Sequence, residues 1–280
     1  MRGGTSKAVF LRECDVPADP SKRNRFLLAI FGSPDQRQID GLGGADPLTS
    51  KCALIGPSSR DDADIDYTFA QIGIEEAYVS YEIICGNISA ATGVYAIEEG
   101  LVRAHESVTT VRVHNTNTGS ILRIKVPIQN GMPRIEGDFE IDGVPGTGAE
   151  IALDYSSTAG GASGKLLPTG NVIDTLLVKS LGRNVNVSIV DVGTICVFFR
   201  AEDLGLIGTE LPSQFTSVQH SAAEEIRHAA DHGGGGLAEF DLHRRGLDRS
   251  GVTAICGVAL FARCGLEFLV YRQHHIVAGG

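Results

Sequence analysis

The sequence predicts an α+β fold made of two similar lobes with a cleft between them. Strand-like segments come in runs with few helices between them, which favours antiparallel connections over β-α-β units. A plan of glycine-rich loop, helix and strands occurs twice, in residues 1–155 and again in residues 156–280. With 280 residues, 42% of them hydrophobic, the chain is long enough for two sizeable cores.

The first lobe is expected to begin with a helix and two strands. Asp19 is a suitable N-cap, Pro20 occupies the first turn and Gly32 marks the helix end. Residues 51–55 are apolar enough for a buried strand, and residues 64–72 alternate as a half-buried strand.

A second helix of this lobe is predicted directly after Cys85. Ile88, Ala91 and Tyr95 recur at intervals of three to four residues, and Gly100 closes the segment. Strand-like alternation returns at residues 107–113 and 120–126. The element order of this lobe is therefore helix, strands, helix, strands.

The second lobe repeats the plan with weaker signals. A Gly/Ser/Thr-rich loop at 156–169 is followed by a predicted helix at 172–180 and strands at 185–190 and 196–200. Beyond about residue 212 the pattern is atypical, and only a short helix around 222–230 is predicted.

Composition excludes several classes of partner. The net charge is −10, and the chain has neither a basic run nor a tryptophan, so nucleic acid and anionic membranes are not expected partners. No signal-peptide pattern and no membrane-spanning stretch occurs, which predicts a cytoplasmic protein. The six cysteines lack any paired spacing, so we expect neither a disulfide framework nor a structural zinc site.

Two side chains in glycine-rich segments are the candidates for chemistry. Lys51 ends Gly-Leu-Gly-Gly-Ala-Asp-Pro-Leu-Thr-Ser-Lys, and Cys85 opens Cys-Gly-Asn-Ile-Ser-Ala-Ala-Thr-Gly. Free amides at a helix start can stabilise a thiolate or bind a carboxylate, and partial burial can make a lysine a base. The alternatives are an inert buried cysteine and a solvated lysine. We interpret the pair as groups that move a proton beside a carboxylate.

Other polar segments are less specific. The segments 2–7 and 160–165 lack the spacing of a phosphate-binding loop, and their hydroxyls and amides suit carboxylate oxygens instead. Residues 114–118, His-Asn-Thr-Asn-Thr, fit either an ordinary turn or a polar ligand site. The histidines near the C-terminus lack a metal-ligand spacing, so no metal is expected.

In these motifs the chain resembles the PrpF-like family of the diaminopimelate-epimerase superfold. The matching segments are residues 1–10, 40–51, 64–72, 85–102, 114–118, 164–171 and 203–211. The resemblance implies two lobes, each an antiparallel sheet wrapped around a central helix, with the active site between them and no metal or organic cofactor. It also implies that Lys51 and Cys85 are the catalytic pair. Residues expected to bind substrate are Thr5, Ser6, Ser50, Gly86, Asn87, Asn115 and Thr169.

The activity implied is a cofactor-independent isomerisation of an unsaturated di- or tricarboxylate, with 2-methylaconitate-like substrates first. Removing a proton that is allylic to a C=C and alpha to a carboxylate builds a dienolate-like anion, which helix-end amides and hydroxyls can stabilise. The alternatives are an oxalomesaconate-type keto-enol tautomerase and an amino-acid racemase or epimerase of the same superfold. From a different class, the chain could be a non-catalytic, carboxylate-binding paralogue.

Compared with the family, the chain is expected to be shortened at both ends, with an incomplete second lobe. We therefore expect a weak catalyst or none. A homodimer is compatible with this interpretation.

Overall fold

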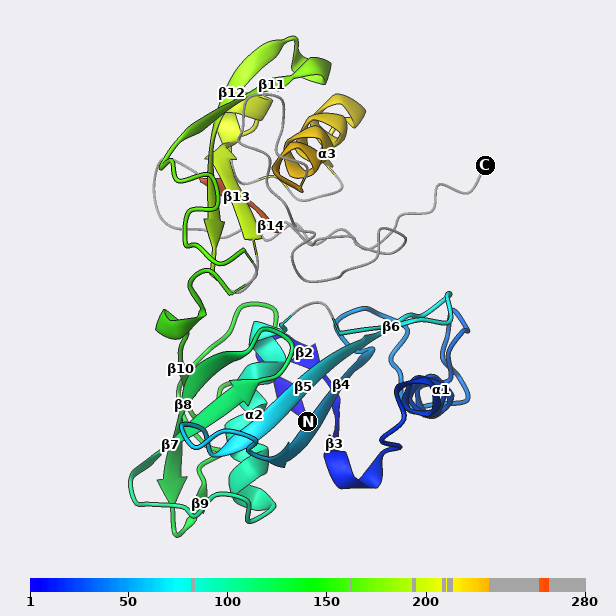
Figure 1. Cartoon of the computed structure of the whole chain (residues 1–280), viewed down its shortest axis with the longest axis vertical. Coiled ribbons are helices and arrows are strands. Elements are labelled where there is room, and N and C mark those ends of the chain that lie inside the picture. Colours follow the sequence, from blue (N-terminus) through cyan, green and yellow to red (C-terminus); the bar gives the residue numbers. More distant parts are fainter. Residues whose placement is uncertain are drawn as a thin grey trace. The chain divides into compact units, whose positions relative to one another are not determined.

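Mixed β-sheets with few helices make up the structure, a computed structural model that describes residues 1–81, 84–161, 163–192, 195–207, 210, 214–231 and 257–261. The α+β class expected from the sequence is confirmed. The chain divides into two units, Met1–Thr158 and Ala159–Gly280 (Figure 1).

Unit 1 is built on a sheet of eight strands with the order β10-β8-β7-β5-β4-β3, to which β6 is added beside β5 and β9 beside β8. A two-stranded hairpin, β1 (Arg2–Gly3) with β2 (Ser6–Lys7), precedes the sheet. The strands of the sheet are β3 (Val9–Arg12), β4 (Lys51–Pro57), β5 (Ile65–Ile72), β6 (Val79–Ser80), β7 (Val108–Asn115), β8 (Ser120–Gln129), β9 (Met132–Pro133) and β10 (Ala152–Asp154).

The antiparallel pairing predicted for this lobe holds for most of its strands but is wrong for two pairs. Strands β3 and β4 run parallel, as do β5 and β7. In both cases a helix lies between the two strands in the sequence, and a long connection of this kind lets the chain return in the same direction.

Two helices pack on opposite faces of this sheet. Helix α1 (Pro20–Phe31) shares a buried apolar cluster with Cys52, Leu54, Ala70 and Ile72. Helix α2 (Gly86–Glu98) shares the other cluster with Ala53, Ile55, Ile65, Tyr67 and Phe69. Successive side chains of a strand point to opposite faces, so even-numbered residues of β4 and β5 face α1 and odd-numbered residues face α2.

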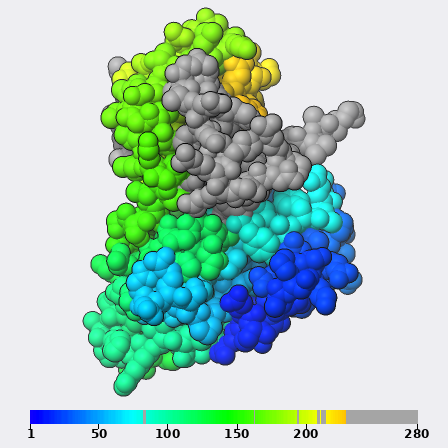
Figure 2. All heavy atoms as spheres, in the orientation of Figure 1, coloured from blue at the N-terminus to red at the C-terminus, as the bar shows by residue number. Residues whose placement is uncertain are grey.

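Local capping explains where α1 begins and ends. The Asp19 carboxylate accepts a hydrogen bond of 2.8 Å from the backbone N–H of Lys22, and Pro20 stands at the first turn. Gly32 takes a left-handed conformation with φ of 72° and ends the helix. The predicted bounds of α1 are therefore confirmed. In Figure 2 the dark blue part of the chain that contains α1 lies at the surface.

Helix α2 lies very close to the sheet. A Cβ atom added at Gly93 would lie 2.9 Å from Val126 Cγ2, so a larger side chain would push the helix away from β8. Its buried hydroxyls bond inside the helix: Ser89 Oγ donates to Cys85 O at 2.9 Å and Thr92 Oγ1 to Ser89 O at 2.8 Å. The helix therefore presents few unsatisfied polar groups to the core.

Unit 2 contains a four-stranded sheet of order β11-β12-β13-β14, with one parallel pair, β13 and β14. Its elements are β11 (Asp174–Val178), β12 (Arg183–Asp191), β13 (Ile195–Arg200), β14 (Gly257–Phe261) and α3 (Ser217–Asp231). Short 3₁₀ helices complete the two units: Glu13–Asp15, Ser156–Thr158, Lys179–Leu181 and Ala201–Leu204. The core packs Ala222 and Ile226 of α3 against the sheet.

The helix predicted at 172–180 is wrong, because residues 174–178 form β11. Asp174, Leu176 and Val178 are buried while the residues between them are exposed, which is the period of a strand. Pairing with β12 decides the outcome. The helix predicted at 222–230 is confirmed within α3, and most residues beyond 212 lie outside the described residues.

Candidate functional site

Lys51 is the first residue of β4 and faces α2. Like Ala53 and Ile55, it is an odd-numbered residue of the strand, and its side chain is fully buried. Lys51 Nζ donates a hydrogen bond of 2.6 Å to Gln71 Oε1 and lies 5.3 Å from the centre of the Phe69 ring. A buried lysine held this way has one position for its amine, which suits proton transfer to a fixed ligand.

Gln71 is oriented by the backbone beside it. Its Nε2 donates to Ser50 O at 2.9 Å and to Pro47 O at 3.2 Å, so its oxygen is the atom turned toward Lys51. An amide oxygen accepts from either an amine or an ammonium group. Gln71 therefore holds Lys51 in place without adding a negative charge. Sequence reasoning missed this residue, although it stands opposite Lys51 in the β4–β5 register.

Cys85 is the N-cap residue of α2 and is fully buried. The Cys85 side chain makes no capping hydrogen bond at this helix end. The amides of its first turn have no intrahelical acceptors, and the first backbone bond of the helix runs from Ser89 N to Cys85 O at 2.9 Å. The start of α2 can therefore stabilise negative charge, as the sequence predicted.

The β1–β2 hairpin packs tightly against the start of α2. A Cβ atom at Gly3 would lie 2.1 Å from Asn87 O, and one at Gly4 would lie 2.4 Å from Asn87 Oδ1. Asn87 Nδ2 donates to Thr5 Oγ1 at 2.9 Å and to Ser6 Oγ at 3.3 Å. Because both hydroxyl oxygens act as acceptors here, their own protons can be donated to a ligand.

The same hairpin also touches the segment that leads to Lys51, because Lys7 N donates to Leu48 O at 2.9 Å. The Arg-Gly-Gly-Thr-Ser, Thr-Ser-Lys and Cys-Gly-Asn segments thus meet within unit 1. The structure brings together Thr5, Ser6, Gly86 and Asn87, with Lys51 and Cys85 on the same side of the sheet.

The hydroxyl of Ser50 is engaged within the loop that precedes β4. Ser50 Oγ donates to Ile72 O at 3.0 Å and accepts from Gln38 Nε2 at 2.8 Å. Gln38 Oε1 accepts from Ala45 N at 2.9 Å, and Cβ atoms at Gly43 and Gly44 would meet Gln38 and Thr49 at 2.2 Å. The glycine-rich loop therefore winds around the Gln38 amide and fixes the start of β4.

Asn115 and Thr169 both bond within their own turns. Asn115 Oδ1 accepts from Thr118 N at 3.0 Å and from its hydroxyl at 2.9 Å. Thr169, in unit 2, donates from Oγ1 to Asp174 Oδ2 at 2.7 Å. Their substrate-binding roles stay predictions, and their observed contacts shape the loops.

Two buried tyrosine hydroxyls lie near Cys85 and were not singled out from the sequence. Tyr67 and Tyr155 have phenol oxygens that are shielded from solvent and make no hydrogen bond of ordinary geometry within the described part of the chain. Burial raises the pKa of Tyr67, and the charge of a Cys85 thiolate raises it further. Burial likewise raises the pKa of Tyr155 to about 12. Both groups therefore stay protonated donors at neutral pH.

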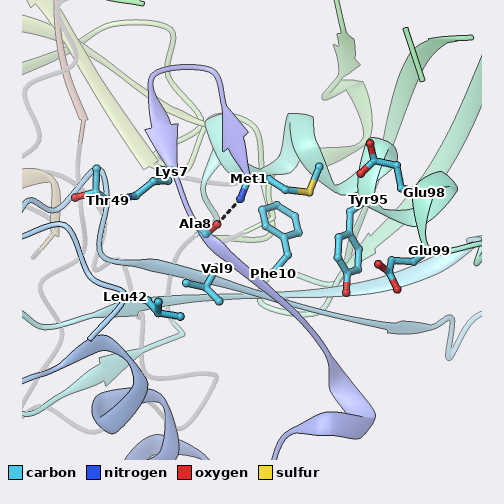
Figure 3. Close-up of a pocket in the computed structure, with 10 residues that line it drawn as sticks. All are labelled: Met1, Lys7, Ala8, Val9, Phe10, Leu42, Thr49, Tyr95, Glu98 and Glu99. Atoms are coloured by element: carbon cyan, nitrogen blue, oxygen red, sulfur yellow. Dashed lines mark hydrogen bonds between the residues drawn. The ribbon is translucent and has the colours of Figure 1, made fainter. Parts of the chain in front are cut away.

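A cavity of about 470 Å³ lies elsewhere in unit 1, between β3, the loop before β4 and the end of α2. Figure 3 shows the Phe10 and Tyr95 rings side by side in the lining of this cavity, with Glu98 and Glu99 near Tyr95. The centroids of the two rings are 5.3 Å apart. None of the predicted site residues lines it. Among the described residues, no group of three or more potential metal ligands gathers in one place.

Comparisons with known proteins agree with the motifs that meet in unit 1. The family model of the PrpF protein matches residues 1–245. This chain belongs to the PrpF family. The 3-methylitaconate isomerase of Eubacterium barkeri is 55% identical over 229 residues, which are 81% of this chain and 60% of that protein. The 4-oxalomesaconate tautomerase of Pseudomonas putida is 49% identical, over 75% of this chain and 56% of that protein.

Two further similarities extend this result. The 2-methyl-aconitate isomerase of Shewanella oneidensis is 40% identical, over 80% of this chain and 59% of that protein. A crystal structure of methylitaconate-delta-isomerase aligns with a TM-score of 0.70 and 52% identity, over 81% of this chain and 58% of that chain. This chain therefore has the family fold and spans about 60% of the length of the curated relatives it matches.

Proposed function

We propose that this protein is an isomerase that moves a proton and a double bond in an unsaturated di- or tricarboxylate. The observation that carries the proposal is the placement of Lys51 and Cys85 on the same side of one sheet, both fully buried, with the β1–β2 hairpin in contact with both of their motifs. Family relatives named for methylitaconate, 2-methyl-aconitate and oxalomesaconate support the substrate class.

The chemistry follows from these groups. One of Lys51 and Cys85 removes a proton from a carbon that is allylic to the C=C and alpha to a carboxylate. The electron pair left behind spreads over the double bond and the carboxylate, and first-turn amides of α2 with the hydroxyls of Thr5 and Ser6 stabilise that charge. Return of a proton at the other end of the allylic system, by the same residue or by its partner, completes the isomerisation.

A keto-enol tautomerisation of an oxalomesaconate-type substrate is the second candidate. It uses the same acid and base groups, and the 49% identity to a relative named as that tautomerase favours it. A racemase or epimerase of amino acids is a third reading. The resemblance implies that those enzymes use two opposed cysteines and that Lys51 stands in the place of the first, which makes this reading the weakest.

Proton NMR in D₂O tests the proposal. Purified protein is incubated with 2-methylaconitate, methylitaconate, oxalomesaconate and, as a control, a proline enantiomer. We expect exchange of allylic protons and appearance of the isomeric acid with at least one unsaturated acid, and no exchange with proline. Exchange with proline alone would overturn the proposal. Absence of turnover with every acid would also overturn it and would favour the alternative of a non-catalytic, carboxylate-binding paralogue.

We propose a small polycarboxylate as substrate, a cytoplasmic location and a homodimer as the assembly, with neither nucleic acid nor membrane as partner and neither a metal nor an organic cofactor needed for catalysis. Among the described residues, none of the helices has both the length and the apolar character required to cross a bilayer.

A further inference from the structure

The region around Cys85 contains two donors that the reaction described above does not use. Tyr67 comes from the middle of β5 and Tyr155 from the segment after β10, so two distant parts of the chain bring a phenol to the same helix start. The Tyr67 side chain is completely buried in the cluster that contains Cys85. Tyr155 packs against that cluster, and its hydroxyl lies 3.1 Å from the position a Cβ would take on Gly86.

Leaving such hydroxyls without partners is costly. A buried O–H that exchanges its bond to water for no bond in the protein destabilises the fold, whereas a phenylalanine of nearly the same shape would avoid this cost. The Ser89 hydroxyl, which donates to Cys85 O at 2.9 Å, is a polar neighbour that lowers the pKa of both phenols. Among the described residues, neither phenol oxygen has a hydrogen-bond partner of ordinary geometry.

The group that can accept from them is the sulfur of Cys85. A charge on Cys85 acts on both phenols, and Cys85 lies in the same buried cluster as Tyr67, against which Tyr155 packs. Other buried polar or ionisable groups on this face are Lys51 and Gln71 of β4 and β5, Thr109 and Asn115 of β7, Ser120 of β8, and Ser89 and Thr92 of α2. Neutral donors next to a buried thiolate supply stabilisation that surrounding apolar side chains cannot.

We propose that Tyr67 and Tyr155 are positioning residues that donate hydrogen bonds to Cys85 when it carries negative charge. They act together with the first-turn amides of α2, so that the thiolate is stabilised from the sheet, from the helix and from the segment after β10. The inference rests on the proposed role of Cys85 in proton transfer. It adds donors that stabilise negative charge on Cys85 in a fully buried position.

The rate of Cys85 alkylation tests this directly. Each of Tyr67→Phe, Tyr155→Phe and the control Tyr95→Phe is treated with iodoacetamide at pH 7, and modification of the Cys85 peptide is followed by mass spectrometry. Tyr95 lies on the same helix near its other end, where its ring contacts Phe10. We expect the rate to fall about 10-fold in the first two variants, because loss of a hydrogen bond to a charged group has this magnitude. The control should keep the wild-type rate.

The direction of the change separates this role from a packing role. If the hydroxyls only filled space, their loss would loosen the core and Cys85 would react faster or at the same rate. An unchanged or faster rate at pH 7 in both variants would overturn the inference, and a decrease in one alone would remove the other tyrosine from it. Because alkylation needs no substrate, the result is independent of whether the isomerase activity is found.

Discussion

The two faces of the unit 1 sheet contain the same residue types in opposite roles. The face toward α1 holds Cys52 in an apolar cluster, and the Tyr81 hydroxyl there donates to Asn24 Oδ1 at 2.8 Å. The face toward α2 holds Cys85 at a helix start and Tyr67 with an unbonded hydroxyl. On the α1 face the thiol is packed among apolar side chains and the phenol is hydrogen-bonded, so this face contributes to stability. On the α2 face the thiol and the phenol remain able to exchange or donate a proton, which is the arrangement expected at a site of proton transfer.

The largest effect should come from the α1 face and should concern stability alone. Phe31 is fully buried in the α1 cluster, so Phe31→Ala should cost about 3–5 kcal/mol of unfolding free energy through the cavity it leaves. Urea unfolding measures this loss. In buffer without urea, at a temperature where the variant stays folded, its turnover per folded molecule should match that of the wild type. A loss of turnover in variant protein that is still folded would show that the α1 face also takes part in catalysis, contrary to the comparison.

The next effect should concern chemistry alone. Lys51→Ala and Cys85→Ser should each lower turnover by about 10²-fold or more, as expected for a positioned acid or base. Cys52→Ser is the matched control, because Cys52 is the neighbour of Lys51 on β4 but points to the α1 face. Steady-state rates beside circular dichroism spectra make the test. Equal loss in Cys52→Ser and Cys85→Ser would show that the two faces are not functionally distinct.

Alkaline pH should weaken the α1 face in a predictable direction. Burial raises the pKa of the Cys52 thiol from 9.0 to about 12. A pKa raised in the folded state gives stability that is complete below the unfolded value and is lost as pH rises toward the folded value. The unfolding free energy should therefore fall from pH 9 upward, by about 1 kcal/mol at pH 10. Cys52→Ala should flatten this slope, and an unchanged slope would assign the alkaline loss to other groups.

The smallest effect compares two tyrosines. Tyr81→Phe removes a satisfied hydroxyl and should cost about 1 kcal/mol, whereas Tyr67→Phe removes an unsatisfied one and should leave stability unchanged or slightly higher. Thermal melts of the two variants, recorded together, provide the measurement. A larger loss for Tyr67→Phe than for Tyr81→Phe would mean that the Tyr67 hydroxyl is bonded in the resting protein.

Features encoded locally could be predicted from the sequence. Asp19 and Gly32 set the bounds of α1 because capping depends on neighbouring residues. Helix α2 was predicted for the same reason, with Cys85 at its start. Strand β11 was missed because a short apolar segment fits either state, and only its pairing with β12 decides it. The parallel pairs depend equally on distant segments.

The candidate site shows the same limit. Lys51 and Cys85 stand out because glycine and hydroxyl residues flank them in the chain. Gln71 and Tyr67 look like ordinary alternating strand residues, and their significance appears only when register and burial place them beside Lys51 and Cys85. Whether a hydroxyl lacks a hydrogen-bond partner depends on how the interior packs, so it cannot be predicted from the order of residues along the chain.

The loop that winds around Gln38 should determine which substitutions this part of the sequence tolerates. Exposed loops ordinarily accept most substitutions, and Leu42 in this loop is 60% exposed. At Gly43 and Gly44, however, even a methyl group would meet another side chain at 2.2 Å. The Gln38 amide is held by three hydrogen bonds, so a saturation library should be depleted of most replacements at these two glycines while accepting most changes at Leu42. The pattern of tolerated and rejected substitutions within a few neighbouring residues would then reflect how the loop is folded.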